Sequence, residues 1–305
     1  MELQHLTYFI KTAELNNISR TADFFNITQP SLSKAISTLE QELGTKLFDR
    51  IGRRIQLNEH GMLFLKSVTS ALRELEDGTL NIKRIAKTPI GHVKIGAFSA
   101  TNIVADCFAA YAKDNPYVRF TVRTTDFRIF KEYMHSNSPS DFDLIFYNSD
   151  SRLDMHMERI PIIHEKYVAI MHQDHPLAKR ESIALAELSN SPFVAYHRKE
   201  IDQTYQFCME AGFAPNIAYE TDNVSIKPEL INVGAAVGLI PQICIEDYKK
   251  SYSSICFVPI CNPQCTRTVY LGWKSDNYLT AAARSFKDFA VSFYRHKFGK
   301  VPEDR

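Results

Sequence analysis

Hydrophobic residues in the first 58 positions recur every three or four residues, within short blocks that polar residues separate. That spacing predicts three amphipathic helices. The first is expected over positions 3–13 and ends at Asn16, and Ser19 is expected to cap the second. The third is expected to begin at Thr28, with Pro30 in a first turn that needs no N–H group, and to end at Gly44.

The third predicted helix has two different faces. Its apolar positions between 32 and 43 form an inward stripe, and the acidic residues come only at its far end. The outward stripe consists of Gln29, Ser33 and Ser37, with Lys34 beside it. Two helices joined by a short turn, the second with short polar side chains outward, are typical of a helix-turn-helix that reads base edges in a major groove. An ordinary helical hairpin with a solvated face is the alternative, and this stretch alone does not separate the two.

A basic segment follows the three helices. Positions 46–57 contain one acidic residue and four basic ones, namely Lys46, Arg50, Arg53 and Arg54. Short apolar pieces at 47–48 and 55–57, on either side of Gly52, predict a small β-hairpin with Arg53 and Arg54 at or near its tip. Guanidinium groups there suit phosphates or a narrow minor groove. The segment therefore predicts a wing and favours DNA binding over the plain hairpin.

Residues 59–87 contain no proline and keep mostly apolar residues alternately four and three positions apart. This is the pattern of a helix that pairs with another helix, and about 29 residues make a rod of roughly 40 Å. An amphipathic helix packed on its own domain is the alternative. The residues expected to pair two chains are Leu65, Val68, Leu72, Leu75 and Ile82.

The pattern changes at Thr88-Pro89. Apolar runs at 93–97, 118–122, 143–147 and 167–171 predict strands, and 103–112 predicts a helix. The alternation indicates an α/β sheet. We expect the chain to change lobe near residues 161–163 and to return near 264–266, which makes two lobes around a ligand cleft. The expected domains are 1–58 for DNA binding, 59–89 for linking and dimerisation, and 90–305 for effector binding, with lobe I at about 90–162 and 266–305 and lobe II at about 163–265.

The motif residues of the first sixty positions resemble those of the LysR-type transcriptional regulators. The matching positions are Ala22, Ile27 to Lys34, Ile36, Leu39, Glu40, Leu43, Gly44, Leu47 to Arg50, Gly52 to Arg54, Leu57 and Gly61. Thr21 and Asn58 depart from the family's usual Ala and Thr, away from the presumed DNA face. A looser similarity continues at 174–178 and 233–241, and residues 208–215 are similar to members that activate glutamate synthesis.

The resemblance implies a multidomain fold: an N-terminal all-α winged helix-turn-helix, a long linker helix, and a two-lobed α/β effector domain like that of periplasmic binding proteins. It implies a transcriptional regulator that binds promoter double-stranded DNA as a homodimer or homotetramer, with RNA polymerase as a further candidate partner. The residues expected to contact DNA are Thr28, Gln29, Pro30, Ser31, Ser33, Lys34, Ser37, Lys46, Arg50, Arg53 and Arg54.

The effector candidates are Ser99, Thr101, Phe127, Arg128, Tyr196, Arg198, Asn223 and Ser225. The hydroxyl and amide residues among them stand at predicted helix starts, which attract carboxylates and phosphates. The others follow predicted strands, at the edge where α/β sheets bind ligands. Plain capping without a ligand is the alternative at each helix start. We expect a small organic anion or amino acid, with Arg128 or Arg198 as its charge partner.

Composition argues against other classes of protein. Lys and Arg number 36 and Asp and Glu 35, so basic character is local rather than general. The absence of an 18-residue apolar run, a signal-like start or a CxxC pair predicts a cytoplasmic protein with reduced thiols and no membrane contact. His172 and His175 lack a zinc-type pattern, and no nucleophile or phosphate-loop motif appears, so we expect no metal, no cofactor and no enzyme. An enzyme or solute carrier on the two-lobed unit, or a DNA-binding scaffold with a degenerate cleft, remain the alternatives.

Overall fold

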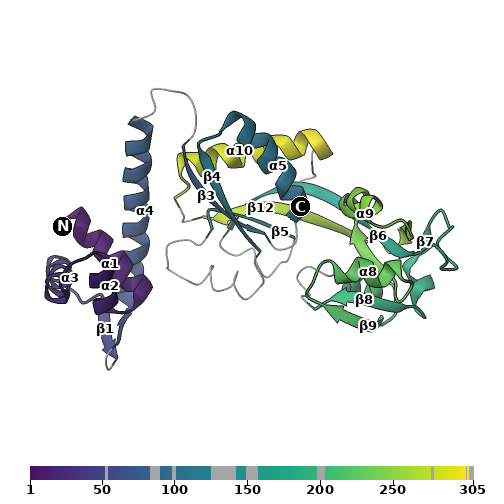
Figure 1. The fold of residues 1–305 in the computed structure, drawn as a ribbon, viewed down its shortest axis with the longest axis horizontal. Helices are drawn as coiled ribbons and strands as arrows, with labels where there is room; N and C mark the ends of the chain where they lie inside the picture. Colours follow the sequence, from purple (N-terminus) through teal and green to yellow (C-terminus); the bar gives the residue numbers. More distant parts are fainter. Residues whose placement is uncertain are drawn as a thin grey trace.

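An N-terminal domain, lobe I and lobe II follow one another in the computed structural model of the chain (Figure 1). The structure describes residues 1–51, 54–82, 90–97, 101–124, 142–148, 157–197, 203–275, 278–299 and 301. The candidate residues that lie outside these ranges are Arg53, Ser99, Phe127, Arg128 and Arg198. Within these ranges, every helix is too short or too polar to span a bilayer.

The N-terminal domain consists of α1 (Leu3–Leu15), α2 (Ile18–Phe24), α3 (Gln29–Leu43), the antiparallel hairpin of β1 (Phe48–Ile51) and β2 (Arg54–Leu57), and α4 (Glu59–Ile82). Thr28 caps α3 as predicted, because its Oγ1 accepts a hydrogen bond from the Ser31 N–H at 3.3 Å. The cap predicted for α2 at Ser19 is wrong. Asn17 caps this helix through a 3.0 Å bond from the Arg20 N–H, and Ser19 already lies inside the first turn.

The core of this domain joins α1, α3 and the first half of α4. Leu65 and Val68 are each only 3% exposed, in contact with residues of their own chain, and Leu72 packs beside them. Leu65 and Val68 therefore have little surface left for a second chain, because the same apolar spacing serves packing on the helix's own domain. Leu75 is 53% exposed, and the side chain of Ile82 lies outside the described part.

The start of α4 lies directly against the segment that leads into the wing. A Cβ atom at Gly61 would come within 2.1 Å of the Leu47 carbonyl oxygen and 2.7 Å of Leu57 Cδ2, so this close approach requires glycine. Asn58 Oδ1 accepts a bond from the Gly61 N–H at 2.9 Å, and Asn58 Nδ2 donates to the Lys46 carbonyl at 3.0 Å. The asparagine that departs from the family pattern thus caps α4 and ties it to the wing.

The two lobes, which the sequence predicts to bind an effector, consist of β3 (Gly91–Ala97), α5 (Thr101–Asp114), β4 (Val118–Thr124), β5 (Leu144–Asn148), β6 (Met157–His172), β7 (Ile183–Ala184), η2 (Leu185–Leu188), β8 (Pro192–Tyr196), α7 (Thr204–Glu210), β9 (Asn216–Thr221), α8 (Ile226–Asn232), β10 (Gly238–Pro241), η3 (Gln242–Cys244), α9 (Ile245–Ser251), β11 (Ile255–Asn262), β12 (Thr266–Lys274) and α10 (Ala281–Phe298). The main sheet has the order β4-β3-β5-β12-β6-β11-β7, and β10 also pairs with β6. Strands β8 and β9 form a parallel pair of their own.

The long strand β6 belongs to both lobes, and Figure 1 shows β6 and β12 running from one lobe to the other. The first half of β6 pairs with β12, and its second half pairs with β10 and β11. The run expected as a separate strand at 167–171 is this second half. The register with β12 shifts between Val269, opposite Ile163, and Tyr270, opposite Pro161, which leaves Ile162 as an extra residue. Such a bulge accommodates a proline inside a strand.

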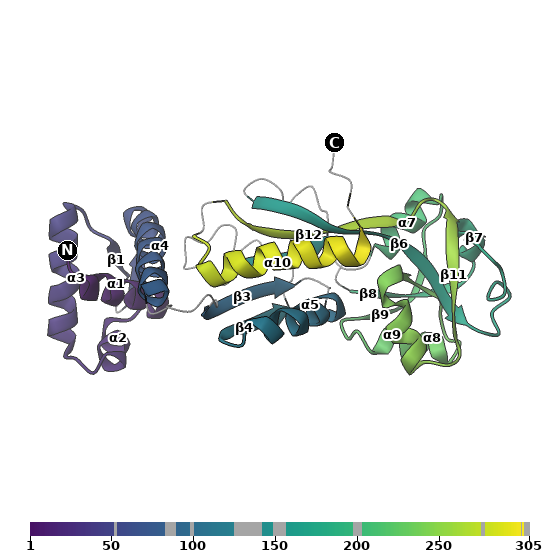
Figure 2. The ribbon, with the colours of Figure 1, turned by 90° about the horizontal axis from the view of Figure 1, so that it is seen from above.

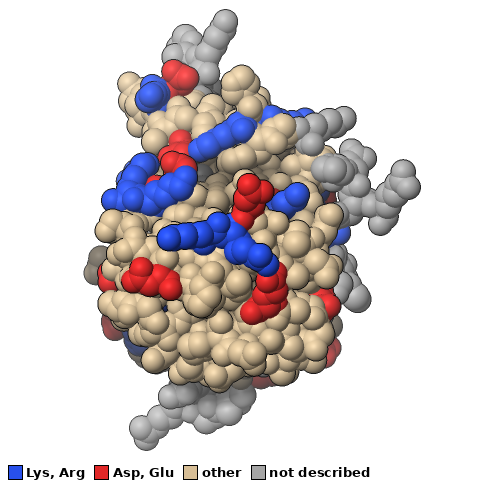
Figure 3. All heavy atoms as spheres, turned by 90° about the vertical axis from the view of Figure 1, so that its right-hand side faces the viewer, with Lys and Arg blue, Asp and Glu red and all other residues tan. Residues whose placement is uncertain are grey.

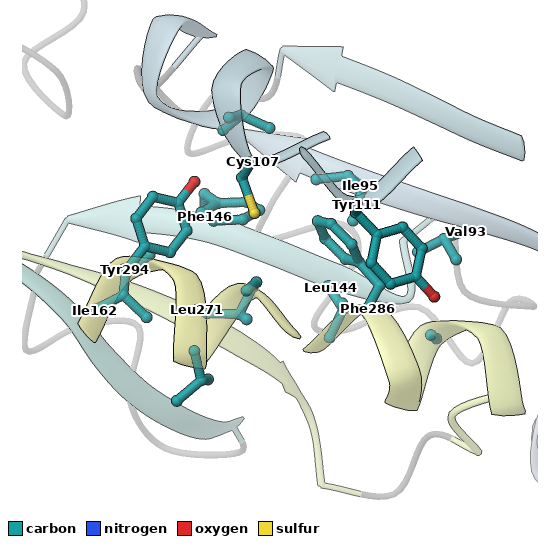
Figure 4. Close-up of a cluster of buried hydrophobic side chains, with 14 of the residues drawn as sticks. Val93, Ile95, Cys107, Tyr111, Leu144, Phe146, Ile162, Leu271, Phe286 and Tyr294 are labelled. Carbon is teal, nitrogen blue, oxygen red and sulfur yellow. The ribbon is translucent and has the colours of Figure 1, made fainter. Parts of the chain in front are cut away.

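Each lobe has its own hydrophobic core. In lobe I, the strand residues Ile95 and Leu144 lie beside Tyr111 of α5 and Phe286 of α10, and Phe146 packs on Tyr294 of α10 (Figure 4). In lobe II, β6, β8 and β10 contribute to two clusters, one that includes Phe193 and one that includes Val194. Helix α10, which the sequence interpretation did not identify, covers the sheet of lobe I beside α5 (Figure 2). The two α/β lobes joined by two strands confirm the predicted fold class.

Candidate nucleic-acid interface and effector region

Helix α3 is exposed along its outward side. Figure 2 shows it on the side of the N-terminal domain that faces away from the effector domain. The structure leaves Gln29 and Lys34 exposed and Ser33 and Ser37 half-buried, and the first-turn residues Thr28, Pro30 and Ser31 are exposed as well. Ser19 Oγ donates a hydrogen bond to Gln29 Oε1 at 3.2 Å. Helix α2 thus orients the first side chain of the outward stripe.

The two acids at the end of α3 are both paired with other groups of the chain, Glu40 in the interior and Glu42 on the surface. Glu40 is buried, and its two oxygens accept bonds from Lys46 Nζ at 2.6 Å and from the Leu47 N–H at 3.0 Å. Glu42 pairs with the amino group of Met1 at 2.8 Å. The carboxylates therefore do not oppose a phosphate on the outward face. Lys46, expected as a phosphate ligand, also fastens the wing to α3.

The wing is a tight hairpin. Ile51 pairs with Arg54, and the turn predicted near Gly52 lies outside the described residues. Arg54 begins β2 and Arg50 lies in β1, opposite Ile55. The side chains of these two arginines, like all of Arg53, lie outside the described part of the structure.

Three effector candidates lie together in lobe II. The Tyr196 hydroxyl donates to the Val224 carbonyl at 3.3 Å, so the end of β8 contacts the turn before α8. In that turn Asn223 Oδ1 accepts a bond from the Ser225 N–H at 2.9 Å. Asn223 and Ser225 are exposed. Thr101 begins α5, but its side chain, like the remaining candidates, lies outside the described residues.

A buried ion pair connects the crossing strands between the lobes. Arg267 of β12 donates from Nε to Glu165 Oε1 of β6 at 2.8 Å, and the other Glu165 oxygen accepts the Ile243 N–H at 3.0 Å. Burial lowers the pKa of Arg267, but the neighbouring Tyr167 and Glu165 raise it by more. The pKa of Arg267 is therefore raised above its ordinary value. The guanidinium therefore stays charged, and its partner is fixed by groups of lobe II.

Asn148 ends β5 at the carboxyl edge of the parallel strands of lobe I. It is 7% exposed, and its Oδ1 accepts a 3.4 Å bond from Arg267 Nη1. Its buried Nδ2 has no hydrogen-bond partner among the residues that the structure describes. An unsatisfied buried donor costs about 1–3 kcal/mol, so a molecule that accepts a hydrogen bond here would be stabilised. The sequence interpretation missed Asn148, although it directly follows a predicted strand.

Lys227 is a second residue that sequence reasoning missed. It lies in the first turn of α8, is only 1% exposed, and holds its ammonium 4.7 Å from the ring centroid of Tyr196. A Cβ atom at Gly238 would come within 3.1 Å of Lys227 Cε, so the glycine leaves room for the lysine. A buried cation thus lies beside an effector candidate. The sequence signal that could have identified Lys227 is its position two residues after the effector candidate Ser225.

Three of the six cysteines are core residues. Cys107, Cys208 and Cys265 are buried, and burial raises the pKa of Cys107 and of Cys265 to about 12. Thiols of such high pKa react slowly, because the thiolate is the nucleophile. Within the described residues, His, Cys, Asp and Glu form no group of three that could hold a metal ion. His175 accepts the Leu177 N–H at 3.2 Å and so stabilises a turn.

Comparisons with known proteins agree with this arrangement. The family model "Bacterial regulatory helix-turn-helix protein, lysR family" matches residues 3–62, and "LysR substrate binding domain" matches residues 86–295. The transcriptional dual regulator GltC of Bacillus subtilis (strain 168) is 28% identical over 298 residues, covering 96% of this chain and 98% of GltC.

Solved structures of full-length chains share the fold. A full-length OxyR variant with one cysteine replaced, from Pseudomonas aeruginosa, has a TM-score of 0.68 at 18% identity, covering 97% of this chain and 95% of that one. Full-length CbnR, crystallised with its target DNA, has a TM-score of 0.57 at 19% identity, covering 96% of this chain and 100% of that one. Because the two family models together match most of the sequence, the chain belongs to the LysR family of DNA-binding transcriptional regulators, which carry an effector-binding domain and are not enzymes.

Proposed function

We propose that this regulator inserts α3 into the major groove of promoter DNA while the hairpin of β1 and β2 contacts the phosphates. The observation that carries the proposal is the exposed side of α3, free of acidic side chains from position 29 to 39, whose terminal carboxylates are bound elsewhere. The solved complex of CbnR with its target DNA supports it by analogy. The proposed contacts remain those expected from the sequence, with Gln29, Ser33 and Ser37 toward the bases and Lys34 and the wing arginines toward the backbone.

The charge at the opposite end of the molecule fits DNA poorly. Figure 3 shows the end formed by lobe II, where Lys and Arg side chains lie among Asp and Glu. Exposed pairs in lobe II include Arg180 with Glu187 and Lys249 with Glu246, each at 3.0 Å. Mixed charges release few counterions from DNA. We therefore assign DNA binding to residues 1–58, linking and dimerisation to 59–89, and effector binding to 90–305.

Two chains are proposed to pair through the exposed side of α4. Leu63 is 66% exposed, and Ser67, Ala71 and Leu75 follow it at four-residue intervals on the same side. This stripe replaces Leu65 and Val68 as the contact between chains. We expect Leu63→Lys with Leu75→Lys to halve the mass measured by light scattering, or to convert a tetramer into smaller species. Leu3→Lys, at an exposed position of α1, is the control, and an unchanged mass in the α4 double variant would refute the assignment.

The effector is proposed to be a small organic anion or amino acid bound between the lobes. Tyr196, Asn223 and Ser225 would contact it from lobe II, with Lys227 as a buried cation and Asn148 as a donor from lobe I. The other expected contacts, whose side chains lie outside the described part of the structure, are Ser99, Thr101, Phe127 and either Arg128 or Arg198. A ligand present at 100 times its Kd should raise the unfolding free energy by about 2.7 kcal/mol, which a thermal-shift screen of amino acids and organic acids would detect.

Fluorescence anisotropy with the DNA upstream of the gene and with random DNA tests the groove assignment. Gln29→Ala should reduce the preference for the promoter, since a base contact carries about 1–3 kcal/mol of discrimination. The double variant Arg53→Ala with Arg54→Ala should weaken binding to both DNAs alike. The slope of log affinity against log salt concentration should become less steep by about one unit for each lost phosphate contact. Lys249→Ala in lobe II is the control. Promoter preference that survives Gln29→Ala would contradict the assignment.

Promoter binding also has consequences for location and partners. A bacterial regulator that occupies promoter DNA works in the cytoplasm, where RNA polymerase meets the same DNA. The relationship to regulators of glutamate synthesis stays a proposal, supported by the similarity to GltC.

A further inference from the structure

Asp143 is a buried carboxylate directly before β5, at the end of that strand opposite Asn148. Its Oδ2 accepts a hydrogen bond from the Lys94 N–H at 2.8 Å, and its own N–H donates to the Lys94 carbonyl at 2.8 Å. These two bonds close the pairing of β3 with β5. A neutral amide could accept the same backbone bond, so the strand pairing alone does not require a negative charge.

A cation from outside the effector domain reaches this carboxylate. Arg73 Nη1 of α4 lies 3.4 Å from Asp143 Oδ1, and the arginine side chain is itself largely buried. Seventy residues separate the two in sequence. Arg73 directly follows Leu72, the last residue of α4 that packs on the N-terminal core. The contact therefore lies where α4 leaves its own domain and comes alongside lobe I.

Burial makes the loss of this contact more costly than the loss of an ordinary surface ion pair. Surface pairs contribute about 0–1 kcal/mol, because water screens both charges. A buried carboxylate that loses its cation is more costly, because the remaining charge stays away from water. Burial raises the pKa of Asp143, and the Lys94 bond and the Arg73 charge oppose that shift. The arginine thus helps to keep the carboxylate ionised while α4 rests against lobe I.

We propose that Arg73 and Asp143 form a latch that fixes the direction of α4, and with it α3, relative to lobe I. Arg73 and Asp143 would thus form a regulatory contact away from the proposed effector region. All five residues of β5 are buried, and the strand connects Asp143 to Asn148, which contacts the ion pair between the lobes. If the ion pair between the lobes moves, β5 would transmit this movement from Asn148 to Asp143 as one rigid element.

Distance measurement by electron spin resonance on the full chain tests the latch without DNA or effector. Spin labels are attached to cysteines at Gln41 on α3 and Lys113 on α5, both exposed, in a background with Cys256→Ser and Cys261→Ser. Labelled protein is diluted with unlabelled protein, so that distances within one chain dominate. An intact latch should give one narrow distance distribution.

Arg73→Gln and Asp143→Asn should each broaden that distribution about twofold, because a released arm samples hinge motions. Asp143→Asn keeps an oxygen for the Lys94 N–H, so lobe I should still fold, and the fluorescence of Trp273 in its core reports this. Arg180→Gln, which breaks an exposed pair in lobe II, is the matched control and should leave the width unchanged.

The double variant distinguishes a shared contact from two separate effects. If the residues act through one contact, Arg73→Gln with Asp143→Asn should broaden the distribution no more than either change alone. Widths that stay narrow in both single variants, or that add in the double variant, would overturn the proposal. Neither result depends on the DNA or effector assignments, so the latch can fail while the proposed function stands.

Discussion

The DNA-binding surface and the effector region are assembled in different ways. The proposed DNA contacts lie between Thr28 and Arg54, and bonds between near neighbours, such as Glu40 with Lys46, hold them in place. The effector region draws on β5, β6, β8, α8 and β12, and its central pair joins Glu165 to Arg267 across 102 positions. The DNA-binding surface depends on caps and close packing, whereas the effector region depends on the crossing of strands between the lobes. A substitution in one region should therefore destabilise that region and leave the other unchanged.

The largest effect is expected from Arg267→Ala. It leaves Glu165 buried without its cation, and breaking such a pair costs about 3–5 kcal/mol. Urea unfolding followed by the fluorescence of Trp273, the single tryptophan of the chain, measures this loss in the effector domain. Arg180→Ala removes an exposed pair and should cost at most about 1 kcal/mol. Equal losses in the two variants would contradict a special role for the crossing.

Gly61→Ala should damage the N-terminal domain alone. The added methyl collides with the Leu47 backbone, and overpacking of this kind costs about 1–3 kcal/mol or more. We expect DNA binding to be lost at a lower urea concentration, while the Trp273 transition stays in place. Gly78→Ala in the same helix meets open space and should stabilise by up to about 1 kcal/mol. If both alanines shift the two transitions together, the domains are not independent.

A smaller effect distinguishes Asn17 from Ser19. Asn17→Ala removes the observed cap of α2 and should cost about 1 kcal/mol, seen as faster hydrogen exchange in that helix. Ser19→Ala should leave exchange in α2 nearly unchanged and act only through the orientation of Gln29. Faster exchange after Ser19→Ala would restore the cap that the sequence predicted.

The smallest effect concerns thiol chemistry in the effector domain. At pH 8, exposed Cys261 should react first with a disulfide reagent. Cys107 and Cys265, with pKa values near 12, carry about one thiolate in ten thousand at that pH and should react only after unfolding. Rapid labelling of either buried cysteine in the native protein would show that its lobe opens.

The helices and hairpin of the N-terminal domain were predictable because their signals are local. Thr28 and Gly44 mark the ends of α3 in the sequence itself. The surface against which the apolar stripe of α4 packs was not predictable, since such a stripe suits either a second chain or the same domain. In the structure, Leu65 packs in the core of its own domain. The pair of Glu165 and Arg267 was missed because no local pattern reports which strands cross. Sequence interpretation placed Tyr196, Asn223 and Ser225 in one region but overlooked Lys227, whose burial is a tertiary property.

The long strand β6, which is shared by both lobes, limits how they can move. A backbone of 16 residues is about 50 Å long and cannot stretch. Its bulge at Ile162 is the place where the strand bends most easily. Because β6 and β12 both cross between the lobes, we expect the lobes to turn about this point rather than to slide apart. A ligand bound between the lobes would therefore act by rotating one lobe relative to the other.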